Sequence, residues 1–193
     1  MKNIWVLSVR TSLPNTIEFF DNISTKIYTF EHFEDARDSM RKCLKDLSCE
    51  NAMFDENGDI KYLVSEIESY DDEWLKEYVD EGNELNGDEL TKEMITTFYQ
   101  SLKDIFNGKD VDFNYQQRKY SDYSFISMNV GDNGVSLYGD YDGPMNCCNG
   151  FVGTNAFSME EEKNYYLDIH NFFECEYEEA AVLSVNLIKA ELS

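Results

Sequence analysis

The chain has 193 residues, a formal net charge of −23 at pH 7 and an apolar content of 42%. Its thirteen phenylalanines, thirteen tyrosines and two tryptophans are too many large rings for a disordered acidic polymer, so we expect one folded domain over residues 1–193. An anionic membrane and bare nucleic acid are poor direct partners, because both repel so negative a chain.

The sequence shows no targeting or membrane-spanning pattern. It contains no run of about 18 apolar residues, the length that a transmembrane helix needs. Met1-Lys2-Asn3 leads directly into a strand-like segment without the apolar core of a signal peptide, which predicts a cytoplasmic location. No secreted disulfide framework is expected, because the five cysteines are an odd number without regular spacing: Cys43, Cys49, Cys147, Cys148 and Cys175.

Two strands are predicted near the N-terminus. Residues 4–9 are apolar on both alternating faces, which is typical of a central strand covered on two sides. Residues 26–30 form the second predicted strand, which the chain reaches through a loop containing Pro14.

An amphipathic helix is predicted over residues 31–47. Acidic side chains fill its first turn and basic ones its last, as the helix macrodipole favours: Glu31, Glu34 and Asp35, then Arg41, Lys42 and Lys45. Its inward face is expected to consist of Phe33, Ala36, Met40, Cys43, Leu44 and Leu47.

Residues 50–107 are predicted to form an acidic helical lobe. Apolar residues at helical spacing between 60 and 78 predict two short helices that meet near Tyr70 and Asp71, with one bent helix as the alternative. A longer helix is predicted over 88–107, ending at a glycine and facing inward with Leu90, Met94, Phe98, Leu102, Ile105 and Phe106.

From Val111 onward the apolar period changes from 3.6 to 2. Residues 123–130 and 135–138 flank Gly131-Asp132-Asn133-Gly134, which predicts an antiparallel hairpin because Asn-Gly tolerates positive φ. An extra strand is an option at 111–118.

Residues 139–157 are rich in Gly, Asn and Asp, and we interpret them as a mobile working loop. Ser158-Met159-Glu160-Glu161 has the pattern of a capping box and predicts a helix that continues to about residue 173. A final strand is predicted over about 178–189. Because the strands cluster instead of alternating with helices, the sequence predicts an α+β fold: a mostly antiparallel sheet with packed helices and the acidic lobe.

Negative charge is concentrated in two blocks. Residues 1–48 carry seven acidic and seven basic side chains, and residues 101–130 carry four of each. Residues 49–100 carry sixteen acidic and three basic side chains, and residues 131–193 carry twelve and two. Like charges in a compact state repel one another, so this segregation favours a binding partner over solubility alone.

Metal-binding patterns are weak. Four oxygen-bearing side chains fall at positions 1, 3, 5 and 12 of a calcium-binding loop: Asp55, Asn57, Asp59 and Glu66. Position 6 must be glycine and is Ile60, so we do not expect an EF-hand. Asp140 and Asp142, with Asp132 nearby, offer further oxygens, but a solvated turn is the simpler interpretation. We therefore expect neither a metal nor a cofactor.

The sequence gives no catalytic signature. The only histidines are His32 and His170. His32 and Cys43 share the predicted helix but lie about three turns apart, roughly 16 Å at the standard rise, too far for a catalytic dyad. There is no P-loop, nucleophile elbow or dinucleotide fingerprint. Paired carboxylates carry no signal, because thirty-nine acidic residues make some pairs inevitable.

The strongest candidate site is therefore the acidic surface. Its proposed contact residues are Glu66, Glu68, Asp71, Asp72, Glu73, Glu77, Asp80, Glu81 and Glu84. Carboxylates at fixed intervals on helices resemble DNA phosphates, which present one negative charge per about 1.7 Å of helix axis. The sequence thus favours a non-enzymatic inhibitor that occupies the basic nucleic-acid-binding surface of a partner, such as a phage or mobile-element inhibitor of a CRISPR effector or another bacterial nuclease.

Two other hypotheses remain. An immunity or adaptor protein would neutralise a basic toxin through the same surface without resembling DNA. A metal-dependent enzyme that uses the 139–157 loop ranks lower.

Overall fold

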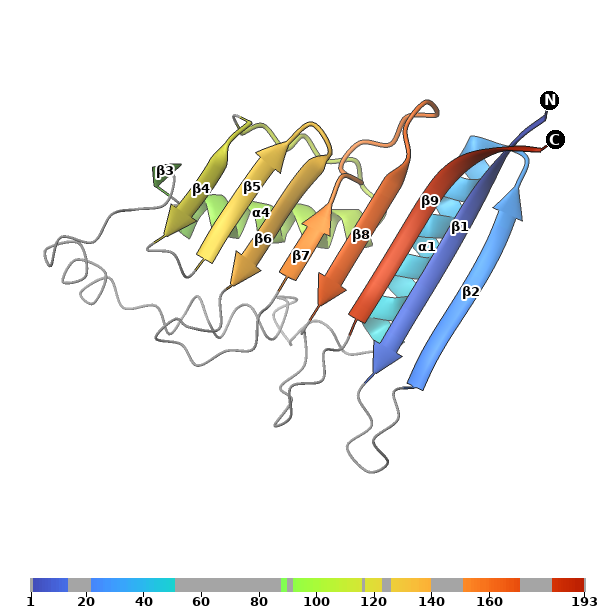
Figure 1. Cartoon of the computed structure of the whole chain (residues 1–193), viewed down its shortest axis with the longest axis horizontal. Coiled ribbons are helices and arrows are strands. Elements are labelled where there is room, and N and C mark those ends of the chain that lie inside the picture. The colour runs from blue at the N-terminus through green and yellow to red at the C-terminus, as the bar shows by residue number, and fades with distance from the viewer. Residues whose placement is uncertain are drawn as a thin grey trace, which may run out of the picture.

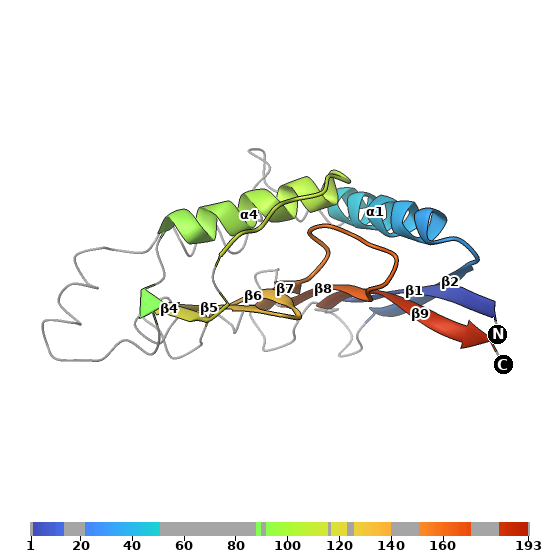
Figure 2. The ribbon, with the colours of Figure 1, turned by 90° about the horizontal axis from the view of Figure 1, so that it is seen from above.

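A nine-stranded sheet with two helices on one of its faces makes up the described part of the chain (Figure 1 and Figure 2). The computed structural model describes residues 2–13, 22–50, 88–89, 92–115, 117–122, 126–139, 151–170 and 182–192. The helices are α1 (Phe33–Glu50) and α4 (Lys92–Phe106). In spatial order the strands are β2 (Asn22–Phe30), β1 (Lys2–Leu13), β9 (Val182–Leu192), β8 (Tyr165–His170), β7 (Phe151–Thr154), β6 (Gly134–Gly139), β5 (Ile126–Gly131), β4 (Lys119–Asp122) and β3 (Asp88–Glu89).

The predicted α+β class is confirmed. All neighbouring strands in the described part are antiparallel except β3 and β4, which are parallel. The predicted final strand is also confirmed as β9, with its bounds shifted towards the C-terminus. Most of the predicted acidic lobe over 50–107, including the two short helices, lies outside the described residues.

β1 confirms the strand predicted over 4–9 and pairs with β2 on one side and β9 on the other. Trp5, Leu7 and Val9 are buried beneath α1, and the Trp5 ring lies 4.9 Å from that of Phe33. The opposite face of β1 carries no helix in the described part of the chain (Figure 2). Of the two covered faces expected for this strand, the described part of the chain shows one, and Ile4, Val6 and Ser8 on the other face are partly buried.

α1 confirms the predicted helix and its inward face. Phe33, Ala36, Met40 and Leu44 are buried, while Cys43 packs partly buried against the same core. The helix continues three residues beyond the predicted end, so its last turn holds no basic side chain, contrary to the expected charge pattern.

α4 confirms the core of the helix predicted over 88–107, but not its start. Residues 88–89 form the short strand β3, which pairs with β4, so the helix begins at Lys92. At the other end Gly108 has a φ of 77°, and its N–H donates to the Ile105 carbonyl at 2.9 Å. This left-handed glycine ends the helix as the sequence predicted.

Residues 109–115 do not form the optional strand at 111–118. Their apolar side chains instead pack on the core: the ring of Phe113 lies 5.9 Å from that of Phe98 and is stacked 5.0 Å from that of Phe157. The Lys109 N–H donates to the Asp104 carbonyl at 2.9 Å, and the Val111 N–H donates to the Phe157 carbonyl at 2.7 Å. Aromatic packing here replaces a strand ladder.

Part of the predicted working loop over 139–157 is instead a strand. β7 pairs with β6 and β8, and Val152, Gly153 and Thr154 are buried. The glycine-rich composition suggested a loop. The strand was missed because its four residues are too few to show a periodic pattern. Residues 140–150 of this prediction lie outside the described part of the chain.

The helix predicted from 158 to 173 is wrong, because β8 occupies residues 165–170. Tyr165, Leu167 and Ile169 are buried on one face at period 2, which a helix does not satisfy. The Tyr165 hydroxyl accepts a hydrogen bond from the Glu160 N–H and donates to the Glu160 carbonyl at 2.9 Å. The capping-box segment is thus a loop fastened to the strand that follows it.

The β5–β6 hairpin is confirmed, and its turn depends on a glycine. Gly134 has a φ of 120°, and a Cβ there would clash with the Thr154 carbonyl and lie 2.9 Å from the Asn155 Cβ. We predict that Gly134→Ala lowers the free energy of unfolding by about 1–3 kcal/mol or more. That range is the typical cost of holding a residue with a side chain at an unfavourable positive φ.

Gly131→Ala is the matched control, because a Cβ at Gly131 meets no atom within 4 Å. Urea denaturation of both variants measures the difference. Equal stability of the two variants would contradict the prediction.

Candidate functional site

None of the nine proposed contact residues between Glu66 and Glu84 falls within the described residues. The same holds for the candidate calcium loop and for Cys147-Cys148. The structure therefore does not place these side chains. It does place the residues at which the chain enters and leaves the acid-rich segments.

Many of these entry and exit points lie at one end of the sheet, which we call the connection end. Leu13 pairs with Asn22, Phe151 with His170, and His170 with Val182. Figure 1 shows these strand ends along the lower side of the sheet, where the C-terminal end of α1 also lies. The connection end consists of Leu13, Asn22, Asp122, Ile126, Gly139, Phe151, His170 and Val182.

Negative charge is distributed unequally between the described residues and the remaining residues. The described residues hold 19 acidic and 14 basic side chains, a net charge of −5. The remaining residues hold 20 acidic and 2 basic side chains, a net charge of −18. Twelve of those acids lie in 51–87, four in 171–181, and two each in 14–21 and 140–150. Three of these segments begin and end at the connection end, and the fourth begins where α1 ends.

Six basic side chains of the described part form ion pairs with described carboxylates. Lys163 pairs with Glu160 at 3.1 Å, and Lys189 with Glu162 at 3.2 Å. Further pairs among the described residues include Arg37–Asp38, Arg41–Asp110, Lys42–Asp46 and Lys109–Asp104. Each exposed pair adds little stability, but it neutralises charge locally. The excess negative charge of the protein therefore belongs mainly to the segments that border the connection end.

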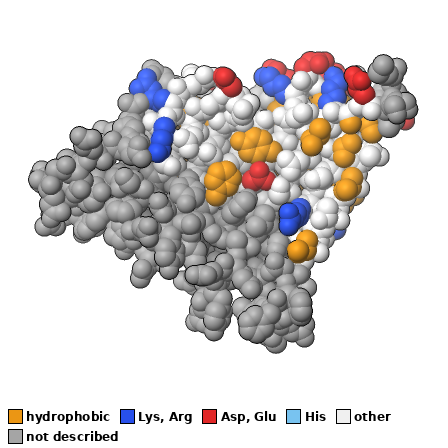
Figure 3. Space-filling model, viewed as in Figure 1, with side chains coloured by type: hydrophobic (Ala, Val, Ile, Leu, Met, Phe, Trp, Pro, Cys, Tyr) orange, Lys and Arg blue, Asp and Glu red, His pale blue; other side chains and the backbone are white. Residues whose placement is uncertain are grey.

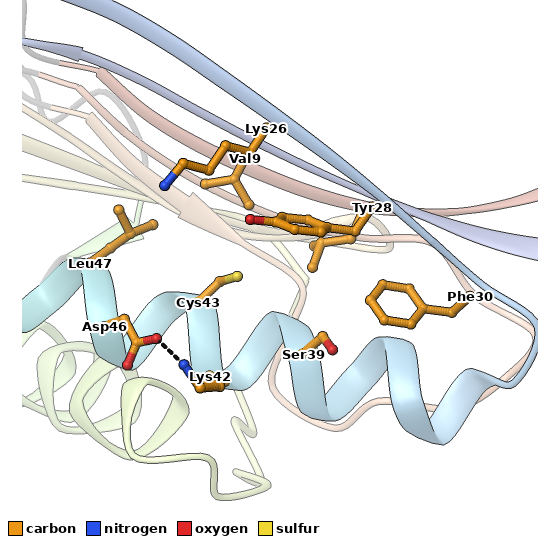
Figure 4. A pocket seen from close by; sticks show the side chains of 10 residues that line it. Val9, Lys26, Tyr28, Phe30, Ser39, Lys42, Cys43, Asp46 and Leu47 are labelled. Carbon is orange, nitrogen blue, oxygen red and sulfur yellow. Dashed lines mark hydrogen bonds and ion pairs between the residues drawn. The ribbon is translucent and has the colours of Figure 1, made fainter.

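A half-open groove of about 330 Å³ lies between α1 and the strands β1 and β2 (Figure 4). Its lining is Leu7, Val9, Lys26, Tyr28, Phe30, Ser39, Lys42, Cys43, Asp46 and Leu47. Burial raises the pKa of the Cys43 thiol, and the nearby Asp46 carboxylate raises it further. A thiol held in its neutral form is a weak nucleophile, and Cys43 acts here as packing.

The face of the sheet opposite the helices, which we call the open face, carries exposed apolar side chains. Ile23 and Ile27 on β2 are 57% and 65% exposed, and Ile188 on β9 is 45% exposed. Figure 3 shows hydrophobic side chains gathered over this part of the open face. Sequence reasoning missed this surface because it began the second strand at residue 26. The alternation of isoleucine with polar residues from Ile23 was the available signal.

Among the described residues, no group of three His, Cys, Asp or Glu side chains could hold a metal ion. Asp132, considered above as a metal ligand, accepts a hydrogen bond from the Gln117 side chain at 2.6 Å. No described helix has the length and apolar character needed to cross a membrane.

The chain matches no family model, no curated protein and no solved structure.

Repulsion among the acids outside the described part predicts a salt-dependent stability. Screening over about 10 Å at 0.1 M salt relieves part of the repulsion, so the melting temperature should rise between low and moderate sodium chloride. Neutralising Glu68, Asp72 and Glu77 to Gln, Asn and Gln should reduce this rise. Calorimetry of both proteins gives the comparison, and a flat or falling melting temperature for the natural sequence would count against a concentrated acidic surface.

The environment of Cys43 predicts a direction for its reactivity. Asp46→Asn removes a negative charge that disfavours the thiolate, so the pKa of Cys43 should fall and alkylation should begin at lower pH. Iodoacetamide labelling followed by peptide mass spectrometry measures this one thiol. Asp38→Asn, on the same helix but paired with Arg37, is the control. A shift of Cys43 alkylation to higher pH in the Asp46 variant would refute this assignment.

Proposed function

We propose that this chain is a non-enzymatic acidic inhibitor that occupies the basic nucleic-acid-binding surface of a partner protein. The observation that carries the proposal is the charge division: the segments outside the described residues hold −18, and the described residues hold −5. A solubilising charge would be spread over the surface. Here it is gathered in a few segments whose neighbouring strand ends lie side by side.

The sheet supports this function by its register. The pairs Leu13–Asn22 and His170–Val182 each hold together the two ends of one acidic segment. The pair Phe151–His170 holds the end of segment 140–150 beside the start of segment 171–181. Acidic segments that are all attached to the connection end have a higher local charge density than the same segments on a free chain. A basic surface is attracted by such a density, and long-range attraction of this kind raises association rates.

The proposed contact residues are those predicted from the sequence, from Glu66 to Glu84. The apolar spacing around them predicts helices, and helical carboxylates at regular intervals would imitate the phosphates of a nucleic acid. A phage or mobile-element inhibitor of a CRISPR effector or other bacterial nuclease, acting in the cytoplasm, is one instance of such a protein.

An immunity or adaptor protein that neutralises a basic toxin would use the same charge. The two functions differ in one measurable respect: a nucleic-acid mimic competes with nucleic acid for its partner, whereas the toxin antagonist need not. Adding DNA or RNA oligonucleotides to the isolated complex distinguishes them. A metal-dependent enzyme using the 139–157 loop ranks below both, and metal analysis of the purified protein addresses it.

The partner can be sought by pull-down from a bacterial lysate at low and high salt. Reversing Asp72, Glu73, Glu77 and Asp80 to lysine should abolish capture of the partner. Electrostatic attraction governs the encounter, so association should slow by at least about tenfold. Exposed substitutions typically change stability by within about 0.5 kcal/mol, so the fold should remain intact by circular dichroism.

A charge-matched control reverses four exposed carboxylates elsewhere: Glu160, Glu161, Glu162 and Glu191. Three of these lie in the connection between β7 and β8, and Glu191 pairs with Asn3, at the end of the sheet opposite the connection end. The control variant has the same net charge as the first and should keep its binding. Equal loss of binding in both variants would show that net charge alone acts, and loss only in the control would move the interface to the opposite end.

A further inference from the structure

The two edges of the sheet are unequal. One edge is β3, which has two residues, Asp88 and Glu89, and is therefore short and acidic. Short and charged edge strands resist pairing with other chains. The other edge is β2, which has nine residues, no proline and a single charged side chain, Lys26. No strand of the described part pairs with the outer side of β2.

β2 also presents apolar side chains where an isolated edge strand would be expected to present polar ones. Ile23 and Ile27 lie on the open face and are more than half exposed, and Tyr28 on the opposite face is 41% exposed. Two half-exposed isoleucines on a long unpaired strand form a surface suited to β-strand addition, in which backbone hydrogen bonds supply affinity and alternate side chains supply specificity.

We propose that the outer edge of β2 pairs with β2 of a second copy of this chain, antiparallel and about a two-fold axis through Thr25. In this register Ile23 of each copy faces Ile27 of the other on the open face. Thr25 faces Thr25 of the second copy. On the helix side Ser24 faces Lys26, and Asn22 faces Tyr28. The strand sequence is thus complementary to itself.

Other symmetric registers are less favourable. Centring the axis on Lys26 would oppose two lysines directly, and like charges at opposed positions destabilise a strand pair. Centring it on Ile27 would pair that residue with its copy but place Ile23 opposite Glu31, beyond the end of β2. The register about Thr25 alone brings all four isoleucines into direct opposition without opposing the lysines.

Charge favours a second copy over a basic partner at this edge. The only charged side chain on β2 is Lys26, which does not attract a basic protein. A basic protein would be attracted to the acidic segments instead. Antiparallel pairing about an axis perpendicular to the sheet also points the two connection ends in opposite directions. Two chains of −23 can therefore join at edges that carry no acidic side chain, with their acidic segments held apart.

Sedimentation equilibrium of the purified full chain over a wide concentration range tests the pairing, and the expected result is a reversible dimer. Ile27→Lys should raise the dimer dissociation constant by about tenfold or more, because it replaces two apolar cross-strand pairs with charged ones. Ile188→Lys is the matched control: it adds the same charge to the same face at an exposed position, two strands in from the edge, and should leave the dimer intact.

A single cysteine at the axis tests the register independently of the lysine variants. Opposed Cβ atoms in a strand pair lie about 4.5–5.5 Å apart, close to the separation a disulfide requires, so Thr25→Cys should form a covalent dimer under mild oxidation. Thr29→Cys, on the same face but away from the axis, should not form one beyond the background of the natural sequence.

A wild-type chain that stays monomeric throughout would overturn the proposal. So would a dimer that Ile27→Lys leaves unchanged, or one that Ile188→Lys weakens equally, since the open face rather than the edge would then be the interface. Efficient cross-linking through Thr29→Cys but not Thr25→Cys would exclude the register.

Discussion

The structure depends on the pairing of β1 with β9. This ladder runs from Lys2↔Leu192 to Ser12↔Val182 and pairs the first described strand with the last, one strand in from the β2 edge. In the described part of the chain, β2 lies on one side of this ladder and the strands from β8 to β3 lie on the other, while α1 packs on its face. Without this ladder the N-terminal β-β-α unit would have no hydrogen-bonded strand partner in the rest of the described sheet. Such long-range pairing gains its contacts only after a large loop has closed, which makes it slow to form.

Much of the fold could be predicted because several elements follow a single strong period. The helical spacing of Phe33, Ala36 and Met40, and of Met94, Phe98 and Leu102, predicted α1 and α4, and all six side chains are buried. What failed were elements decided by their neighbours. Residues 165–170 are a strand because they fit between β7 and β9, although a capping-box pattern precedes them. β3 is too short to have a pattern of its own.

For the candidate site too, one part could be read from the sequence and another part required the structure. Acidic residues can be counted along the sequence, so the concentration of charge was visible without coordinates. That segments far apart in the sequence border one end of the sheet follows only from strand register, which residue counts do not contain. The exposed edge of β2 has the same origin: Ile23 and Ile27 are ordinary strand residues until the strand order places nothing beyond them. The proposed contacts between 66 and 84 remain a prediction from sequence.

The β1–β9 ladder also determines where the two ends of the chain lie. Lys2 and Leu192 are paired at the end of the sheet opposite the connection end, and Figure 1 shows the N and C labels side by side there. A label, affinity tag or surface linker attached at either terminus would therefore extend away from the acid-bearing segments. A short peptide joining the termini would span only neighbouring strands, which makes circularly permuted versions of this chain geometrically accessible.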